Sequence, residues 1–589
     1  RRSGGAAERR SGGAAERRSG GPDDGRVAWW MLAALLLLLP LMPFGGLRAQ
    51  SCQWGYMSSS PSNQLADDAT ITAALVDAAG NTYIGGYFND DVEFSSPTSL
   101  IYDFTAVGGD GDEDGFVAKL DPIGRVLWAR QFEGSSSDQA EWVTSLALDQ
   151  SGNLLVAGWF TSRYLHLYGA SGRLNTQLLT NAGGTNDQAD AFVIRLSPDG
   201  FYQSYYTYSS PAGWETFDAL AVMPNGTIVA GGRSGLDIAV ARWPVSGSFS
   251  DVTVGSAGFD FINDLKVDAA GNVVIVGGFR GASITFGTQP ALTNATANNA
   301  AAAFVARLNG SNQWTQAKTI STNNATADVI INGLTLNAAG VATVVGYFTI
   351  GQLTFGAAGS INHLGPTTTK DGFIARLNTV DWIQRARIGG AGEDNPTDVA
   401  LDASGNAIVV GRYTAPATFG GTTLAAGSGD TFIGRWDGAG NWQGLAAGAA
   451  DGAGVKAVAV GGSGQISIAG DLSNCYTFGS CSECLPSNRS NIFPVFAVSL
   501  SAFPPLATPG DLPAPTFTLA PNPAHDQVRV ELAAEPTALP LVVLDALGRT
   551  VRHQTLPAQT TTATLDVAGL PAGVYIVRCG QATHRLVIE

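Results

Sequence analysis

The sequence predicts an all-β protein built largely from one repeated unit, and three observations support this prediction. The 589 residues include 74 glycines but only 14% charged side chains, a composition that suits many short strands joined by tight turns. A hairpin pattern recurs seven times, and a second strand pattern recurs seven times between its copies. The chain is also too apolar and too aromatic to be disordered.

The hairpin pattern is a short apolar run, a turn containing Gly, and a second apolar run that usually ends in Gly and an aromatic residue. The first copy reads DAAGNTYIGGYF from Asp77, and the fifth reads NAAGVATVVGYF from Asn337. Gly at the fixed turn position supplies the positive φ that tight hairpins require, and the flanking Val, Ile and Leu favour strands. The turn glycines are Gly80, Gly152, Gly226, Gly271, Gly340, Gly405 and Gly464.

The second pattern reads DGFVAKL from Asp114 and DGFIARL from Asp371, and each copy predicts one strand. Most copies precede a further strand that often carries Trp, as at Trp128, Trp314, Trp382 and Trp442. Seven units of about four strands result. One sheet cannot bury both of its faces alone, so the units must stack, either radially as a propeller or linearly as a solenoid.

The two ends of the repeat region favour the ring. The seventh copy of the second pattern, from Pro494, is followed by prolines and by no Trp strand, whereas Trp54 precedes the first hairpin with no strand pattern before it. We therefore expect the segment around Trp54 to pair with residues 494–500, because such pairing removes exposed strand edges. The expected fold is a seven-bladed β-propeller over residues 50–503, closed by its N- and C-terminal strands, and the open solenoid is the alternative.

These hairpins and strands resemble the SBBP (seven-bladed β-propeller) repeat of bacterial proteins. The resemblance covers roughly residues 52–500 and rests on the GN hairpins and the FVARL-type strands. It implies the propeller fold but no single activity.

The front of the chain predicts an export signal. Residues 1–30 are of low complexity, with RRSGGAAE repeated, and we interpret them as an over-extended start. Residues 31–49 predict a secretory signal peptide cleaved after Ala49, because an apolar core precedes a small residue. An uncleaved membrane anchor from Val27 to Leu47 is the alternative, and the prolines within it argue against an anchor.

The C-terminal part predicts a second, smaller domain. A Pro-rich linker over residues 504–515 precedes residues 516–589, where short strands alternate with Gly and Pro turns, as in a small Ig-like β-sandwich. This part resembles the type A C-terminal sorting domain of the type IX secretion system. The resemblance implies passage through that secretion machinery, removal of the tail and attachment at the outer cell surface. The matching motifs are Pro521-Asn522-Pro523, Asp545-Ala546-Leu547-Gly548-Arg549 and Leu570-Pro571-Ala572-Gly573-Val574-Tyr575.

The charge of the chain limits its partners. The net charge is −16, and no run rich in Lys or Arg follows residue 49. Such a surface repels phosphate, so nucleic acid is excluded as a partner. A secreted, surface-displayed binding or structural module with an extracellular glycan or protein ligand is the expected function.

One acidic motif suggests a calcium site. Asp110, Asp112 and Asp114 alternate with other residues and are followed by Gly115, as in calcium-binding loops. Ala118 stands where a further acid would close such a loop, and no other repeat has the triplet. An acidic, Gly-rich surface loop is the alternative. No other cofactor is expected.

The cysteines predict disulfides. Cys475, Cys481 and Cys484 cluster, but a zinc site would need a fourth ligand and no His lies near. Cys52 falls in the strand expected to join the same blade. In an oxidising compartment these four cysteines would form two disulfides, and the sequence does not determine their connectivity.

Recurring charges suggest structural ion pairs. Asp77, Asp149, Asp268 and Asp402 begin hairpins, and a basic residue recurs in the second pattern. Repetition favours a structural role over catalysis. Strict pairing is not expected, because Met223 interrupts the Asp series while Arg242 is present. The basic residues are Lys119, Arg195, Arg242, Arg307, Arg376 and Arg435.

Enzyme motifs are absent from the sequence. There is no H-E-x-x-H or G-x-S-x-G, and the five His are scattered. The alternative function is a carbohydrate-active enzyme on a propeller scaffold, which would need two carboxyl groups roughly 5–10 Å apart in a cleft.

Overall fold

In a computed structural model, the described part of the chain covers most of residues 52–501 and 517–589. The described ranges are 52–58, 69–89, 91–95, 101–106, 112–135, 139–169, 172–183, 188–209, 213–296, 300–367, 369–424, 431–450, 454–472, 475–478, 481–484, 494–501, 517–532, 539–545, 549–579 and 582–589. The predicted signal peptide and the predicted linker lie outside these ranges. Within them, no helix is long and apolar enough to cross a membrane.

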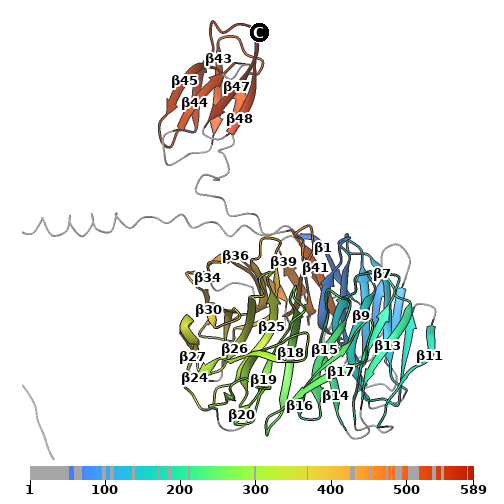
Figure 1. The fold of residues 1–589 in the computed structure, drawn as a ribbon. Helices are drawn as coiled ribbons and strands as arrows, with labels where there is room; N and C mark the ends of the chain where they lie inside the picture. The colour runs from blue at the N-terminus through green and yellow to red at the C-terminus, as the bar shows by residue number, and fades with distance from the viewer. Residues whose placement is uncertain are drawn as a thin grey trace, which may run out of the picture. The chain divides into compact units, whose positions relative to one another are not determined.

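The described repeats form seven antiparallel sheets, each with four strands paired side by side. Figure 1 labels many of these strands. The first three sheets are β2 (Ala69–Val76), β3 (Thr82–Phe88), β6 (Asp114–Leu120), β7 (Val126–Glu133); β8 (Glu141–Leu148), β9 (Leu154–Phe160), β12 (Asp190–Leu196), β13 (Tyr202–Tyr208); and β14 (Glu215–Val222), β15 (Ile228–Ser234), β16 (Asp237–Trp243), β17 (Ser250–Val254). The fourth and fifth are β18 (Asp260–Val267), β19 (Val273–Phe279), β22 (Ala302–Leu308), β23 (Trp314–Thr319); and β25 (Val329–Leu336), β26 (Ala342–Phe348), β29 (Asp371–Leu377), β30 (Trp382–Gly390). The last two are β31 (Asn395–Leu401), β32 (Ala407–Arg412), β35 (Thr431–Trp436), β36 (Trp442–Ala450); and β37 (Gly454–Val460), β38 (Ile466–Asp471), β41 (Val495–Leu500), β1 (Cys52–Met57).

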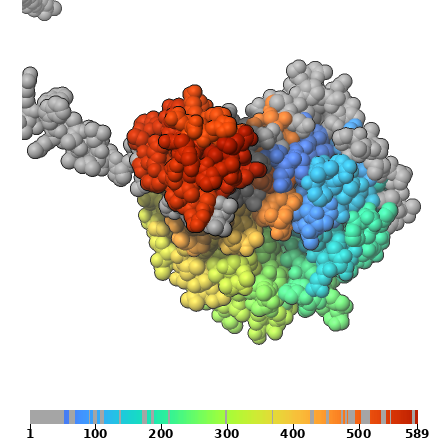
Figure 2. All heavy atoms as spheres, turned by 90° about the horizontal axis from the view of Figure 1, so that it is seen from above, coloured from blue at the N-terminus to red at the C-terminus, as the bar shows by residue number. Residues whose placement is uncertain are grey.

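The sheets follow one another in a propeller-like arrangement. The first strand of each sheet contacts the first strand of the next, and β37 of the last sheet contacts β2 of the first. β1 pairs with β41, with Trp54 opposite Ser499 and Met57 opposite Phe496, as the sequence predicts. Figure 2 shows the blue segment that begins the repeats beside the orange segment that ends them.

Short hairpins are inserted between the second and third strands of most sheets. The third sheet is the exception, because β15 and β16 are joined by a tight turn at Gly235. This explains why the interval from Gly226 to Gly271 is the shortest in the sequence. The insertions are β4 (Asp91–Ser95) with β5 (Ile101–Thr105), β10 (Tyr164–Gly169) with β11 (Gly172–Thr180), β20 (Ser283–Ile284) with β21 (Leu292–Thr293), β27 (Gln352–Phe355), η1 (Gly356–Ala358) and β28 (Gly359–Asn362) beside β24 (Ser321–Thr322), β33 (Ala417–Phe419) with β34 (Thr422–Leu424), and β39 (Cys475–Phe478) with β40 (Cys481–Cys484).

The turn glycines have the backbone conformation that the hairpin pattern predicts. All seven have φ between 72° and 85°, a region that side-chain-bearing residues avoid. In the first hairpin, Gly80 N–H donates to the carbonyl of Asp77, and the Asp77 carboxylate accepts from Ala79 and Asn81 N–H. The repeated D-x-x-G-N sequence therefore specifies this turn locally.

A second glycine in each hairpin makes room for a β-bulge. Every first strand contains one extra residue, such as Asn332 between Ile331 and Gly333. Opposite this bulge, a Cβ on Gly346 would lie 2.0 Å from the carbonyl oxygen of Ile330. Only Gly permits such a close backbone approach. The equivalent glycines are Gly86, Gly158, Gly232, Gly277, Gly411 and Gly470, each with a backbone carbonyl oxygen within 2.3 Å of a built Cβ.

The bulge residue often binds the next sheet through its side chain. Asn332 Nδ2 donates to the carbonyl of Pro396, the residue before the next bulge, at 2.7 Å. Within the described residues, five of the seven sheets make this hydrogen bond, which we call the bulge contact. The other four run from Thr72 to Val143, from Thr144 to Phe217, from Asn263 to Ile331 and from Thr397 to Val455.

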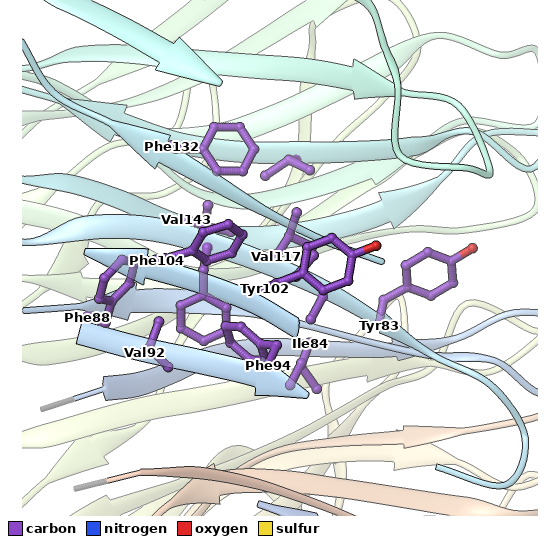
Figure 3. Close-up of a cluster of buried hydrophobic side chains, with 14 of the residues drawn as sticks. Tyr83, Ile84, Phe88, Val92, Phe94, Tyr102, Phe104, Val117, Phe132 and Val143 are labelled. Atoms are coloured by element: carbon purple, nitrogen blue, oxygen red, sulfur yellow. The ribbon is translucent and has the colours of Figure 1, made fainter. Parts of the chain in front are cut away.

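Apolar side chains fill the space between neighbouring sheets. In the first sheet, Phe94 and Phe104 of the inserted hairpin lie in one buried cluster with Phe88 (Figure 3). The ring centroids of Phe94 and Phe116 are 5.1 Å apart. Val143 of the second sheet joins the same cluster. Burial of such aromatic residues dominates the energetics of a packed core.

The C-terminal part forms two further antiparallel sheets that share a core. Val530, Val543 and Tyr575 are buried in it. This agrees with the predicted strands, while the Ig-like description stays a prediction. One sheet is β42 (Phe517–Ala520), β43 (Gln527–Leu532) and β46 (Thr562–Asp566), and the other is β45 (Thr550–Leu556), β44 (Leu539–Leu544), β47 (Gly573–Cys579) and β48 (Ala582–Ile588).

Substitution of a bulge glycine tests whether the close backbone approach requires Gly. We expect Gly346→Ala to lower the free energy of unfolding by about 2–3 kcal/mol, because the new methyl group forces the bulge apart. Gly421→Ala is the control, since no atom lies within 4 Å of a Cβ there. Chemical denaturation measures both variants. Equal stability of Gly346→Ala and the parent chain would contradict a steric requirement for Gly.

Candidate functional site

The predicted calcium loop lies at the start of β6. Asp110 lies outside the described residues, while Asp112 and Asp114 are both buried. Asp112 Oδ1 accepts a hydrogen bond from Gln139 N–H at 3.0 Å, and Asp114 Oδ2 accepts from Gln131 Nε2 at 2.7 Å. Both carboxylates thus serve the local structure. Calcium binding by Asp110, Asp112 and Asp114 stays a prediction.

Asp114 has an acidic neighbour from the next sheet. Burial, and secondarily the Asp114 carboxylate, raise the pKa of Glu141 well above its ordinary value. A protonated Glu141 can share a proton with Asp114, so the two form a buried acid pair. Across the described part of the chain, no group of three His, Cys, Asp or Glu side chains is placed to hold a metal ion.

The acid pair recurs where the third strand of one sheet meets the first strand of the next. Burial raises the pKa of Asp190 to about 6, with Glu215 adding to the effect. Burial likewise raises the pKa of Asp394 to about 7, and its neighbour Asp371 adds to the shift. These carboxyls are fully covered by protein, so they are not placed to reach a substrate.

The recurring Asp and basic residues form ion pairs at the opposite ends of the sheets. Four of the predicted Asp residues each pair with a predicted basic residue. In the fifth sheet, which has no Asp at the start of its hairpin, Arg376 instead donates to Gln384 Oε1 and to the carbonyl of Asp437. The third sheet has Met223 and Arg242 without an acid. The four pairs are Lys119–Asp77 at 3.9 Å, Arg195–Asp149 at 3.4 Å, Arg307–Asp268 at 2.8 Å and Arg435–Asp402 at 2.7 Å.

Arg242 lines a cavity between the third and fourth sheets. The cavity has a volume of about 370 Å³. Met223 and Asn225 line it from the third sheet, and Gly271 and Asn312 line it from the fourth. No Asp or Glu lines it. The only sequence signal for this cavity is Met223, which stands where other hairpins begin with Asp. The sequence alone does not indicate that a cavity lies there.

A chain of partly exposed aromatic residues crosses the first four sheets, and we call it the aromatic arc: Tyr87, Trp142, Trp159, Trp214 and Phe259. Tyr87 stacks on Trp142 with centroids 4.1 Å apart, and Trp142 lies 4.9 Å from Trp159. Trp159 lies 6.1 Å from Trp214. The guanidinium of Arg233 then bridges Trp214 and Phe259, at 5.9 and 4.9 Å from their centroids.

The aromatic arc was not predicted from the sequence. Tyr87 and Trp159 are the aromatic residues that follow the bulge glycine, so the hairpin pattern marked these two positions without assigning them a role. Trp214 is 37% exposed, and the other four are intermediate in exposure. A contiguous, partly exposed aromatic surface is typical of a binding site.

The cysteines are brought to one region of the last sheets. Cys475 on β39 lies opposite Cys484 on β40. β40 contacts β1, which carries Cys52. The two predicted disulfides stay a prediction.

The C-terminal part of the chain indicates the route by which the protein leaves the cell. Residues 518–589 match the family model of the secretion system C-terminal sorting domain. The protein is exported. Type IX secretion machinery carries chains with such a tail, and this chain is delivered to the cell surface or the extracellular space.

The repeat region has more distant relatives. A stretch of 174 residues, 27% of this chain, is 25% identical to an uncharacterised WD repeat-containing protein of Acanthamoeba polyphaga mimivirus, and it spans only 12% of that protein. A virginiamycin B lyase from Staphylococcus aureus is 10% identical, with 76% of this chain and 99% of that chain covered and a TM-score of 0.36. A surface component of the type IX secretion system of Porphyromonas gingivalis, PorZ, is 10% identical, with coverage of 91% and 100% and a TM-score of 0.18. Both TM-scores are below 0.5, and the fold described above rests on the strand pairing of this chain.

The acid pairs predict a pH-dependent stability. The pKa of Asp394 is about 7 in the folded chain against an ordinary value of 3.8, so its contribution to stability is complete below pH 3.8 and is lost as pH rises towards 7. We expect Asp394→Asn to flatten the fall in unfolding free energy between pH 4 and 7. Denaturation at each pH measures this slope.

The neighbouring residue provides the control for this experiment. Glu393→Gln removes a carboxylate whose side chain is 55% exposed, and it should leave the slope unchanged. Parallel pH curves for Asp394→Asn and the parent chain would contradict the buried acid pair.

Proposed function

We propose that this chain is a surface-displayed, seven-bladed β-propeller that binds an extracellular glycan through the aromatic arc. The arc is the observation on which the binding role rests. Flat aromatic faces stack on the apolar C–H faces of sugar rings, and Tyr and Trp bury a large area at small cost in conformational entropy. Arg233 lies among these rings and adds hydrogen-bond donors for hydroxyl groups.

The closed ring is supported by the two ends of the repeat region. β1 supplies the fourth strand of the sheet that contains β41, so sequence-distant segments complete one blade. The Ser58 hydroxyl and N–H also bind the backbone of Val495. Pairing with β1 covers the edge of β41 that would otherwise be open to another chain. Disulfides among Cys52, Cys475, Cys481 and Cys484 would reinforce the same junction.

Replacement of β1 tests ring closure. We expect a Gly/Ser sequence in place of residues 52–57 to lower the melting temperature and to speed hydrogen exchange of the β41 amides that face β1, because their acceptors are lost. Hydrogen exchange read by mass spectrometry measures the loss of protection, and a thermal melt measures the loss of stability. The matched control replaces β17, an outer strand of the third sheet, and should leave β41 protected. Equal protection of β41 in all three chains would favour the open solenoid.

The alternative, a carbohydrate-active enzyme, has less support. Glycoside hydrolysis needs two carboxyl groups that reach the substrate. The acid pairs of this chain, such as Asp371 with Asp394, are buried, and the cavity beside Arg242 has no acidic lining residue. The chain therefore fits a binding module better than a hydrolase.

A glycan array tests the binding role. We expect the purified chain to bind particular glycans on the array. Trp214→Ala should weaken this binding at least tenfold, because stacking on Trp214 would be lost. Phe201→Ala is the control, because Phe201 is 59% exposed and lies outside the arc. Two outcomes would contradict a glycan site at the arc: no binding of the parent chain to any glycan, or an equal loss of glycan binding in Phe201→Ala and Trp214→Ala.

A further inference from the structure

Six of the seven sheets carry the basic residue of the second pattern, and within the described residues five of these six have a polar partner. In the fourth and sixth sheets, Arg307 and Arg435 pair with the Asp that begins the hairpin turn. In the fifth sheet, Arg376 binds Thr343, Gln384 and a backbone carbonyl. The seventh sheet has Ser499 at this position. The third sheet keeps the base, Arg242, and replaces the acid by Met223.

Arg242 is buried without a hydrogen-bond partner in the described part of the chain. The residue is only 5% exposed, and neither its Nε nor its Nη2 has an acceptor. Arg remains charged at neutral pH. A buried charge without a counter-ion is costly, so a complementary anion at this position would stabilise the fold.

The unpartnered atoms form the edge with which Arg recognises a carboxylate. Arg435 directs the same two atoms, Nε and Nη2, to Asp402 Oδ2, each at 2.7 Å. In Arg242 these two atoms are buried without an acceptor, and the residue lines the cavity. The Nε–H and Nη2–H groups are coplanar and match the two oxygens of a carboxylate.

The neighbouring sheet leaves room for a ligand at this point. At other junctions the next sheet supplies the acceptor: Lys119 donates to the carbonyl of Pro198, and Arg307 donates to the carbonyl of Gly340. At Arg242 the corresponding turns, with Gly271 and Gly310, line the cavity of about 370 Å³. This volume suits a molecule of monosaccharide size.

A second polar group in the cavity adds to the specificity. Asn312 lines the cavity, and its Oδ1 is buried without a partner, while its Nδ2 donates to Ser250 Oγ at 3.3 Å. This oxygen would accept a hydrogen bond from a hydroxyl group of the ligand. The net charge of −16 disfavours a doubly charged phosphate relative to a singly charged carboxylate.

We propose that the cavity beside Arg242 binds a small hydroxylated carboxylate of the uronic acid type, whose carboxylate takes the place that Asp occupies in the other sheets. This site lies at the hairpin-turn ends of the strands, away from the strand ends that carry the aromatic arc. It therefore goes beyond the proposed glycan site and does not depend on it.

Binding of glucuronate to the full chain tests the proposal. We expect glucuronate to raise the melting temperature and to bind by calorimetry, whereas glucose, which lacks the carboxylate, does neither. Inorganic phosphate at equal concentration should bind at least tenfold more weakly. Arg242→Gln should weaken glucuronate binding at least tenfold, since hydrogen bonds to a charged group are lost.

A second variant supplies the missing acid within the chain. Met223→Asp should pair with Arg242, raise the melting temperature without ligand and abolish the effect of glucuronate. Trp214→Ala should leave glucuronate binding intact, which separates this site from the aromatic arc. Absence of glucuronate binding in the parent chain, equal binding of phosphate, or full binding in Met223→Asp would each overturn the proposal.

Discussion

The bulge contact between neighbouring first strands is the constraint on which the repeat region depends. Each first strand carries one extra residue, and in five described sheets its side chain binds the backbone just before the next bulge. The interaction sets both the spacing of adjacent sheets and their relative height, because the acceptor is a fixed point of the next strand. A glycine opposite the bulge makes the close backbone approach possible. Loss of that glycine therefore disturbs a junction between sheets as well as one hairpin.

Alignment of the sheets by this contact gives their two ends different chemistry. At one end, acids that begin the third and first strands meet as buried pairs, and aromatic side chains after the bulge glycine of the first and second sheets join the aromatic arc. At the other end, hairpin turns present Asp to a basic residue of the third strand. Repetition makes a departure informative: Arg242 stands out because equivalent bases such as Arg307 and Arg435 are paired.

The buried acids illustrate how a repeat can hold reactive groups without using them. Asp394 has a pKa of about 7, a value that would suit a general acid. Its oxygens, however, accept hydrogen bonds from the N–H groups of Gly390 and Thr414, and protein covers it fully. A perturbed pKa is expected of functional sites and of structural networks alike, and accessibility distinguishes the two. The partly exposed aromatic residues, rather than the acids, are available to a ligand.

The sequence by itself determined the local features of this protein. The D-x-x-G-N turns, the strand patterns and the sorting tail depend on residues within a few positions of one another, so they could be predicted without a fold. The ion pairs were foreseen only in part, and the aromatic arc was not foreseen at all, because its residues come from four sheets. Asp112 and Asp114 resemble calcium ligands in the sequence, and packing places their carboxylates beside Gln139 and Gln131, while calcium binding stays a prediction. The pairing of β1 with β41 could be predicted from the unmatched strands at the two ends of the repeat region. The bulge contacts and the unpartnered edge of Arg242 were decided by the tertiary structure alone, because each depends on neighbouring sheets whose residues are far apart in the chain.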